Sequence, residues 1–287
     1  MSLIKRIYNK LFYVKKKHNH ITYKFFGLRF KIKRKDPLAD MVYSMPYYRH
    51  YMASIEESYG FAGKQVMEIG ADVNLQCALS AIKLGAKEVW AANPRIVVDK
   101  PPIESIHILK ELGEETKLEN EKFDLIYGFA LLEHVLHPRE LAAEVARLLK
   151  PGGHAYLSGS PLWLGPRGHH VYLTVNGRDY HFPDEKLFAP WEHLIYDNLQ
   201  DFAVAMRNRI PDEDIGAVYT WVYESDIISR LSMDDIVNAF KNESRLKIKS
   251  YVRNTLEKPN IYYEKLFERH GGKLLNADSL DIYCTKR

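Results

Sequence analysis

Short apolar runs alternate with amphipathic segments through the middle of the chain. Phe123 to Tyr127 has the pattern of a buried strand. The segment that leads from there to Pro151 has leucine and valine at helical spacing with charged residues on the other face, which predicts an amphipathic helix. We expect Pro151-Gly152-Gly153 to end that helix, and Ala155 to Leu157 to form the next strand. This unit predicts a right-handed crossover between parallel strands. Ligands of such sheets bind at the carboxyl ends of the strands.

The same pattern recurs on both sides of this unit. The expected strands are residues 65–69, 88–92, 106–109, 247–252 and 280–285, and the expected helices are residues 75–84, 232–242 and 262–271, after a helical lead-in at 37–59. The chain is therefore predicted to form an α/β fold, a doubly wound three-layer sandwich around a mostly parallel sheet of seven strands.

The residues that carry a family resemblance lie in the central unit: Phe123, Asp124, Leu132, Glu133, His134, Val135, Pro138, Leu148, Leu149, Lys150, Pro151, Gly152 and Gly153. In order and spacing they resemble the core of class I S-adenosylmethionine-dependent methyltransferases. The resemblance implies a Rossmann-like methyltransferase fold, methyl transfer as the activity, and S-adenosylmethionine as the cofactor. It also implies that the last strand, residues 280–285, runs antiparallel at the edge of the sheet.

By this resemblance the cofactor loop follows the strand at residues 65–69. The family's loop usually reads E-x-G-x-G-x-G; Glu68 and Gly70 match it, but Asp72 and Asn74 replace the second and third glycines. Asp and Asn tolerate a left-handed backbone, so we expect the turn to survive. The next strand usually ends in an acid that binds both ribose hydroxyls, and Asn93 stands there as a weaker, uncharged acceptor.

The resemblance gives further pocket residues. Glu114 would lie near the adenine amino group, and Glu133 and His134 would line the cofactor pocket. The predicted cofactor-binding residues are Glu68, Gly70, Ala71, Asp72, Asn93, Glu114, Phe129, Glu133 and His134.

Residues 161–230 leave the alternating pattern and are predicted to form a cap of loops and short strands. Gly168-His169-His170 and the segment 190–194 resemble type-11-like methyltransferases of sugar and polysaccharide gene clusters. A sugar hydroxyl needs a base, and histidine suits that role. We predict His169 or His170 as that base. The candidate orienting partners are Asp179, Glu192 and His193, and the candidate sugar-stacking rings are Trp163, Tyr172, Tyr180 and Trp191.

Two other interpretations of the cap histidines stay open. They could be hydrogen-bonded loop residues, or His169, His170, His181 and His193 could bind a metal. Adjacent histidines with scattered partners do not have a diagnostic spacing, so no metal site is predicted.

Charge divides the chain into a basic extension at residues 1–36 and a methyltransferase-like domain at residues 37–287. Residues 1–35 contain 12 Lys or Arg and no acid, and the remainder contains 29 Lys or Arg against 37 Asp or Glu. A basic arm with an apolar helical stripe at residues 3–13 suits an anionic partner, which could be a membrane surface, an anionic glycan carrier or nucleic acid. Alternatively, the stripe packs on the body of the protein and the lysines are solvated. Nucleic acid is disfavoured, because no N-P-P-Y-type base-flipping signature is present.

Composition is consistent with a globular protein. Its apolar share is 46%, its two cysteines Cys77 and Cys284 match no metal or redox spacing, and no apolar run approaches the ~20 residues that span a bilayer. We expect a cytoplasmic protein, peripheral at the inner face of the membrane.

Two functions follow from the sequence. The first is S-adenosylmethionine-dependent O-methylation of a sugar or glycan intermediate in surface polysaccharide biosynthesis. The second is a methyltransferase-like binding or scaffold protein at the membrane, which the altered residues Asp72, Asn74 and Asn93 favour.

Overall fold

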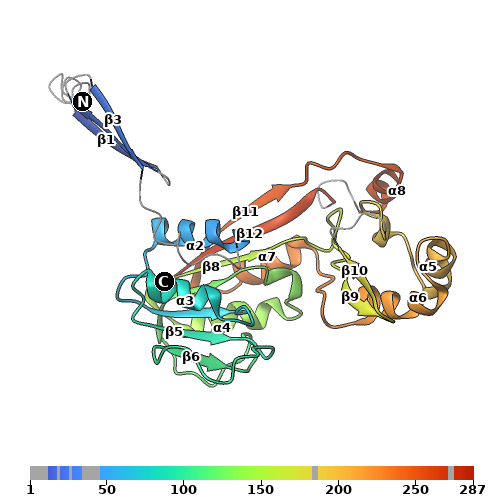
Figure 1. Cartoon of the computed structure of the whole chain (residues 1–287), viewed down its shortest axis with the longest axis horizontal. Coiled ribbons are helices and arrows are strands. Elements are labelled where there is room, and N and C mark those ends of the chain that lie inside the picture. The colour runs from blue at the N-terminus through green and yellow to red at the C-terminus, as the bar shows by residue number, and fades with distance from the viewer. Residues whose placement is uncertain (1–11, 18–19, 26–27, 34–45, 183–186, 271–274) are drawn as a thin grey trace.

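The computed structural model describes residues 12–17, 20–25, 28–33, 46–182, 187–270 and 275–287. A seven-stranded sheet in the order β11-β12-β8-β7-β4-β5-β6 forms its centre (Figure 1). The strands are β4 (Gln65–Ile69), β5 (Glu88–Ala92), β6 (Ile106–Leu109), β7 (Phe123–Gly128), β8 (Leu149–Gly159), β11 (Leu246–Asn254) and β12 (Ala277–Lys286). The predicted fold class is confirmed.

Strand direction follows the expected crossovers, with one correction. From β6 to β8 all neighbouring strands are parallel, whereas β12 is antiparallel to both β8 and β11. β12 therefore lies inside the sheet, and the expectation that it forms the edge is wrong. The physical reason is burial: Leu280, Ile282 and Cys284 of β12 are almost fully buried, while the mostly exposed strand β11 forms the edge.

Helices cover both faces of the sheet. Helices α2 (Pro46–Ser58) and α3 (Gln76–Lys83) pack on one face around residues such as Ile55 and Ala78. Helices α4 (Pro138–Leu148) and α7 (Met233–Lys241) pack on the other around residues such as Val145 and Phe240. Ser232 caps the start of α7 and forms a capping box with Asp235.

The Pro-Gly-Gly segment lies within a strand rather than at the end of the helix. Helix α4 ends at Leu148, and β8 begins at once with Leu149. The pairing with β7 shifts between Phe123 and Leu125, so residues 151–153 are accommodated as an irregularity. A Cβ on Gly153 would lie 2.9 Å from the carbonyl oxygen of Lys150, so this position requires glycine.

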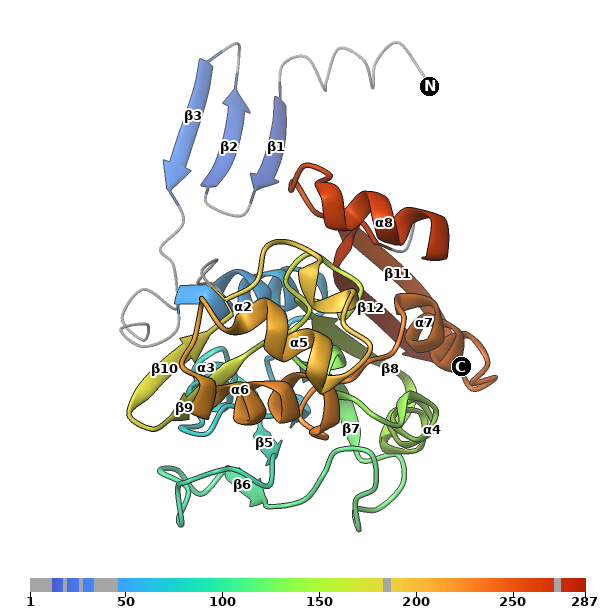
Figure 2. The same ribbon diagram turned by 90° about the vertical axis from the view of Figure 1, so that its right-hand side faces the viewer.

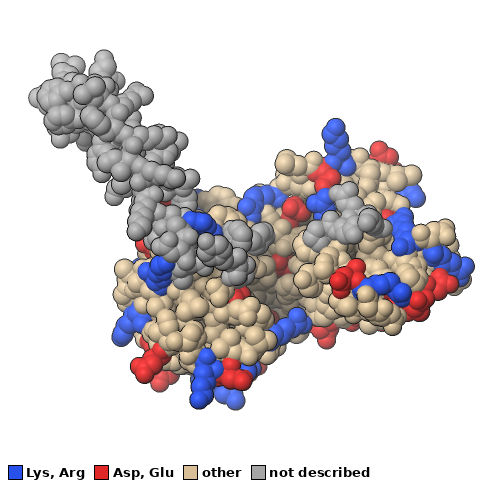
Figure 3. Space-filling view, in the orientation of Figure 1, with Lys and Arg blue, Asp and Glu red and all other residues tan. Residues whose placement is uncertain are grey.

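The cap has more helix than the sequence suggested. It contains the hairpin β9 (Tyr172–Val175) and β10 (Arg178–His181), the 3-10 turn η2 (Glu192–Leu194), the helices α5 (Leu199–Met206) and α6 (Asp212–Tyr219), and the π-helical turn η3 (Thr220–Glu224). These elements share an apolar cluster of their own, which includes Phe202 and Val218. The cap follows the carboxyl end of β8 and lies beyond that end of the sheet in Figure 1. Figure 3 shows the surface hollowed between the two parts.

The described part of the basic extension is a separate antiparallel sheet. It consists of β1 (Phe12–Lys17), β2 (His20–Phe25) and β3 (Leu28–Lys33), in that order, and Figure 2 shows it apart from the central sheet. The expected helical stripe at residues 3–13 lies almost wholly outside the described residues. The last described helix, α8 (Ile261–His270), falls where residues 262–271 were expected to be helical.

Candidate functional site

A cavity of about 400 Å³ opens where β4, β5 and β7 end. We call it the strand-end cavity. Its wall includes seven of the nine predicted cofactor residues: Gly70, Ala71, Asp72, Asn93, Glu114, Phe129 and His134. The other two, Glu68 and Glu133, are buried behind it and are 3% and 2% exposed.

The loop after β4 forms one wall of the cavity, but not by the expected backbone. The left-handed residues are Gly70 (φ 69°) and Leu75 (φ 61°), and neither Asp72 nor Asn74 has a positive φ. The turn therefore forms without a left-handed backbone at Asp72 or Asn74, and their tolerance of that conformation is not used. Asp72 acts through its carboxylate, which accepts from the N–H of Cys77 at 2.9 Å and of Asn74 at 3.1 Å. It thereby satisfies a free donor at the start of α3.

Asn93 joins this loop to the next strand. Its Nδ2 donates to the carbonyl oxygen of Ala71 at 2.6 Å, and its Oδ1 accepts from the N–H of Arg95 at 2.8 Å. A carboxylate at this position could not donate to Ala71. The asparagine thus stabilises the loop, and one lone pair of Oδ1 remains for a ligand.

Two aromatic rings, Phe129 and Tyr48, form another part of the wall, and further rings stack behind them. The Phe129 ring stacks on those of Tyr48, Tyr51 and Tyr127, with centroid separations of 5.6, 5.2 and 5.1 Å. Tyr48, from α2, also lines the cavity, so the lead-in segment reaches the site. These rings give the cavity an apolar side that is suited to a flat ligand or an alkyl chain.

Glu68 is a buried acid beneath the loop. The hydroxyl of Tyr127 donates to its Oε2 at 3.2 Å. Burial, with the nearby charge of Asp72, raises the pKa of Glu68 to about 8. The carboxyl is therefore largely protonated at neutral pH and supports the loop from below.

Glu133, His134 and His170 come together beside the cavity, and of the three only His134 lines it. One ligand-type atom from each residue lies within 4.8 Å of the others. The Nδ1 of His134 lies 2.6 Å from the carbonyl oxygen of Ile227, which can only accept, so Nδ1 carries the proton. Among the described residues, the two carboxyl oxygens of Glu133 have no hydrogen-bond partner. The Nδ1 of His170 has none either.

Burial controls the protonation of these three groups. It raises the pKa of Glu133 to about 8, and with His134 nearby it lowers the pKa of His170 to about 3. Burial also lowers the pKa of His134. All three are therefore predominantly uncharged at neutral pH.

His169 points away from the cavity, although it is adjacent to His170. It is 2% exposed and packs against Phe188 and His193 inside the cap. Neither His169 nor His170 is among the residues that line the strand-end cavity. Of the two predicted bases, only His170 contacts His134, at a ring separation of 4.9 Å.

The proposed orienting partners stabilise the cap instead. Glu192 is fully buried and accepts from the guanidinium of Arg209 at 2.7 Å and the hydroxyl of Tyr196 at 2.6 Å. Burial would raise the pKa of Glu192, but these bonds hold it below its usual value. The Nε2 of His193 is bonded to the carbonyl oxygen of Trp163, and Asp179 accepts from Thr174 on the hairpin. None of them contacts His170 in the described hydrogen bonds.

The expected sugar-stacking rings do not form one surface. Trp191 is fully buried, and its indole N–H donates to the carbonyl oxygen of Leu275 at 2.8 Å. Tyr180 donates to Asp214, whereas Tyr172 is 63% exposed and stacks on His181. The prediction of a shared platform is therefore wrong, because these residues serve different packing roles.

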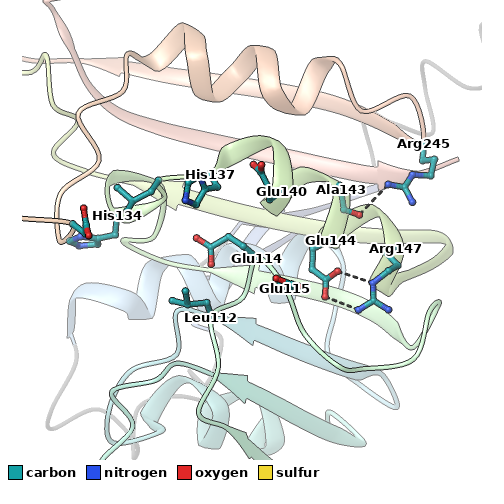
Figure 4. A pocket seen from close by; sticks show the side chains of 12 residues that line it. Leu112, Glu114, Glu115, His134, His137, Glu140, Ala143, Glu144, Arg147 and Arg245 are labelled. Atoms are coloured by element: carbon teal, nitrogen blue, oxygen red, sulfur yellow. Dashed lines mark hydrogen bonds and ion pairs between the residues drawn. The ribbon is translucent and has the colours of Figure 1, made fainter.

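A second cavity of about 720 Å³ adjoins the first along α4 (Figure 4). It shares Leu112, Glu114, His134 and Asp226 with the strand-end cavity. Figure 4 shows Glu144 paired with Arg147 in its wall, at 2.7 Å. Glu144 also accepts from the N–H of Thr116 at 2.9 Å, which holds the loop after β6 against α4.

Sequence reasoning missed several residues of the cavity wall. Arg95 and Glu111 follow the ends of β5 and β6, where the fold alone could have suggested them. Asp226 and Ile227 come from the end of the cap, far along the chain from His134, and no local signal marks them.

Comparison with known proteins finds a family match for the central segment of the chain. Residues 66–157 match the family model described as Methyltransferase domain. A ubiquinone biosynthesis O-methyltransferase of Photobacterium profundum is 23% identical over 107 residues, 34% of this chain and 45% of that protein. An uncharacterized methyltransferase of Mycolicibacterium paratuberculosis is 33% identical over 88 residues, 30% of this chain and 32% of that protein. The matched part spans less than half the length of either relative.

Solved structures share the fold. A crystal structure of an S-adenosylmethionine-dependent methyltransferase from Mesorhizobium loti has a TM-score of 0.50 at 16% identity, over 83% of this chain and 97% of that one. Phosphoethanolamine N-methyltransferase 2 of Haemonchus contortus, in complex with S-adenosylmethionine, has a TM-score of 0.50 at 8% identity, over 99% of this chain and 73% of that one. These two matches support the fold, and the match of residues 66–157 to the Methyltransferase domain model supports the expected enzyme class and cofactor. None of the four proteins is named for a surface polysaccharide.

Proposed function

We propose that this protein is an S-adenosylmethionine-dependent methyltransferase that methylates a hydroxyl oxygen. The observation that carries the proposal is the strand-end cavity, which lies at the carboxyl ends of parallel strands within the segment that matches the methyltransferase family. Its volume falls within the roughly 300–1,000 Å³ of small-molecule sites.

The residues present fit the cofactor. Carboxylates of Asp72, Glu111, Glu114 and Asp226 surround the cavity, against one guanidinium, that of Arg95. This excess of negative charge suits a ligand that carries sulfonium and ammonium groups. A Cβ on Gly128 would lie 2.8 Å from the carbonyl oxygen of Ile69, so glycine keeps the backbone close beneath the cavity.

In this role, Gly70 to Asp72 and Asn93 would hold the polar part of the cofactor, and Phe129 with Tyr48 would pack on its apolar part. The cofactor supplies an electrophilic methyl group when bound. The chain then has to align the acceptor oxygen, exclude water and receive a proton. Of the predicted bases, only His170 adjoins the residues of the cavity.

For the acceptor we propose a sugar or glycan intermediate of surface polysaccharide biosynthesis. The resemblance of Gly168-His169-His170 and of residues 190–194 to enzymes of polysaccharide clusters supports this class. The curated relatives support oxygen as the methylated atom, since one is named an O-methyltransferase. We also propose that the basic extension brings the protein to an anionic membrane surface; among the described residues, no helix is long and apolar enough to cross a membrane.

Calorimetric titration with S-adenosylmethionine tests the proposal. We expect one site per chain, weakened about tenfold or more by Gly70→Val, because Gly70 has a left-handed backbone and an added side chain would meet Leu131 at 3.0 Å. Gly177→Val, at a left-handed position in the cap hairpin with open space around it, is the matched control. The absence of any binding at millimolar cofactor would contradict methyl transfer and leave the scaffold hypothesis.

If the cofactor binds, a second assay tests the acceptor class. It compares transfer of an isotope-labelled methyl group to nucleotide sugars and glycans with transfer to phenols.

A further inference from the structure

We propose that Glu133, His134 and His170 form a binding site for one divalent transition-metal cation of the zinc type. The three residues come from two parts of the chain, the turn after β7 and the start of the cap, and their ligand-type atoms lie within 4.8 Å of one another. The site borders the strand-end cavity, because His134 lines that cavity. This proposal departs from the expectation that the chain has no metal site.

The unpartnered carboxyl of Glu133 is the first independent support. Glu133 is only 2% exposed, and neither carboxyl oxygen has a partner at full hydrogen-bond geometry among the described residues; the nearby donors are the backbone N–H groups of Glu133 and Ser160. A buried polar group without a partner costs free energy, and native structures normally provide one. A cation held between Glu133 and the two histidines would remove this cost.

The histidines are prepared as ligands. The carbonyl oxygen of Ile227 fixes the proton of His134 on Nδ1, which leaves the Nε2 lone pair free. Such a bond from the second ring nitrogen to a carbonyl is the usual support of a metal-binding histidine. The Nδ1 of His170 has no hydrogen-bond partner among the described residues, so that nitrogen is free for a ligand.

The backbone around the site is firmly held. The N–H of Ser229 donates to the carbonyl oxygen of Glu133 at 2.8 Å, so the end of the cap is fastened to the same turn. His170 has a left-handed backbone with φ 45°, and the indole N–H of Trp221 donates to its carbonyl oxygen at 3.3 Å. An unfavourable conformation that is held in this way often marks a functional position.

The donor set selects the class of metal. Two imidazoles and one carboxylate suit Zn²⁺ or Fe²⁺, whereas Mg²⁺ and Ca²⁺ prefer oxygen donors throughout. Zinc ligands lie about 2.0–2.2 Å from the ion, so the three side chains must close slightly around it. Three protein ligands leave a coordination position open, as in catalytic sites. A role for that position in activating an acceptor hydroxyl rests on the proposed function, but the binding site itself does not.

Titration of the full, chelator-treated chain with Zn²⁺, and with Co²⁺ as a spectroscopic probe, tests the site. We expect one equivalent to bind, with visible Co²⁺ bands of a four- or five-coordinate nitrogen and oxygen site. Glu133→Gln and His170→Asn should each weaken binding at least tenfold. His181→Asn, which changes a cap histidine stacked on Tyr172 outside the cluster, should leave it unchanged.

Binding that is absent, or that is unaffected by Glu133→Gln and His170→Asn, would overturn the proposal. Cofactor titration of the unchanged chain is read separately: if it binds the cofactor but no Zn²⁺, only the metal site is overturned, and if it binds Zn²⁺ but no cofactor, only the proposed function is overturned.

Discussion

Glu68 shows how a single buried residue can make stability depend on pH. Its carboxyl lies under the cofactor loop with one side-chain donor, the hydroxyl of Tyr127, and its pKa is raised to about 8 by burial and by Asp72. An unfolded glutamate titrates near pH 4.3. Between these values the folded chain binds a proton that the unfolded chain has lost, so this group's contribution to stability falls as pH rises.

We therefore expect Glu68→Gln to flatten the pH dependence of stability. Glutamine keeps an acceptor for Tyr127 and cannot ionise. In the metal-free protein, the free energy of unfolding should fall less steeply from pH 5.5 to 7.5 in the variant, by up to about 1.4 kcal/mol per pH unit. Urea denaturation at both pH values measures this, with Glu119→Gln at an exposed position as control. Identical slopes in wild type and variant would show that Glu68 ionises normally in the folded chain.

At the scale of the element, the replacement of glycines by Asp72 and Asn74 changes how helix α3 begins. Three residues together shape it: Gly70 turns left-handed, Asp72 bonds the N–H of Cys77, and Leu75 takes a left-handed backbone while its side chain is fully buried. The glycines that the family usually has are thus replaced by a side-chain cap. The loop retains its place at the end of β4, since the N–H groups of Gly70 and Ala71 both donate to the carbonyl oxygen of Ala92.

This arrangement predicts different outcomes for two substitutions of Asp72. Asp72→Ala removes the acceptor for Cys77 and should lower the free energy of unfolding by about 1 kcal/mol. Asp72→Asn keeps one acceptor oxygen and should cost less than about 0.5 kcal/mol. Chemical denaturation at pH 7 distinguishes them. An equal loss in both variants would mean that the charge of Asp72, rather than its hydrogen bond, stabilises the loop.

The same elements show where sequence reasoning ends. Strands β4 and β5 were predicted to the residue, because buried apolar runs bounded by charged and polar residues are local signals. The left-handed backbone of Leu75 was not predicted, because that conformation depends on the burial of its side chain and on Asp72. His169 and His170 are adjacent, yet one enters the core of the cap and the other faces Glu133. In a loop the direction of a side chain is set by tertiary packing, which a pattern along the chain does not contain.

At the scale of the whole molecule, charge is distributed unevenly. The first 35 residues hold 12 Lys or Arg and no acid, and the rest of the chain is acidic in sum. Over the described part of the face in Figure 3, by contrast, Lys and Arg are mixed with Asp and Glu. Attraction to an anionic surface should therefore come from the extension rather than from the body.

Neutralising part of the extension tests this with the chain length kept. Each Lys near an anionic membrane contributes about 1 kcal/mol, so changing Lys15, Lys16 and Lys17 together to Gln should weaken vesicle binding by roughly two orders of magnitude. The same three positions changed to Arg keep the charge and should bind as the wild type does. Sedimentation with vesicles rich in phosphatidylserine measures the affinity, and raising the salt concentration should weaken the wild type towards the Gln variant. Vesicle binding that depends on neither salt nor these lysines would place the membrane contact elsewhere on the chain. Equal binding to RNA at the same salt concentration would favour a general affinity for polyanions.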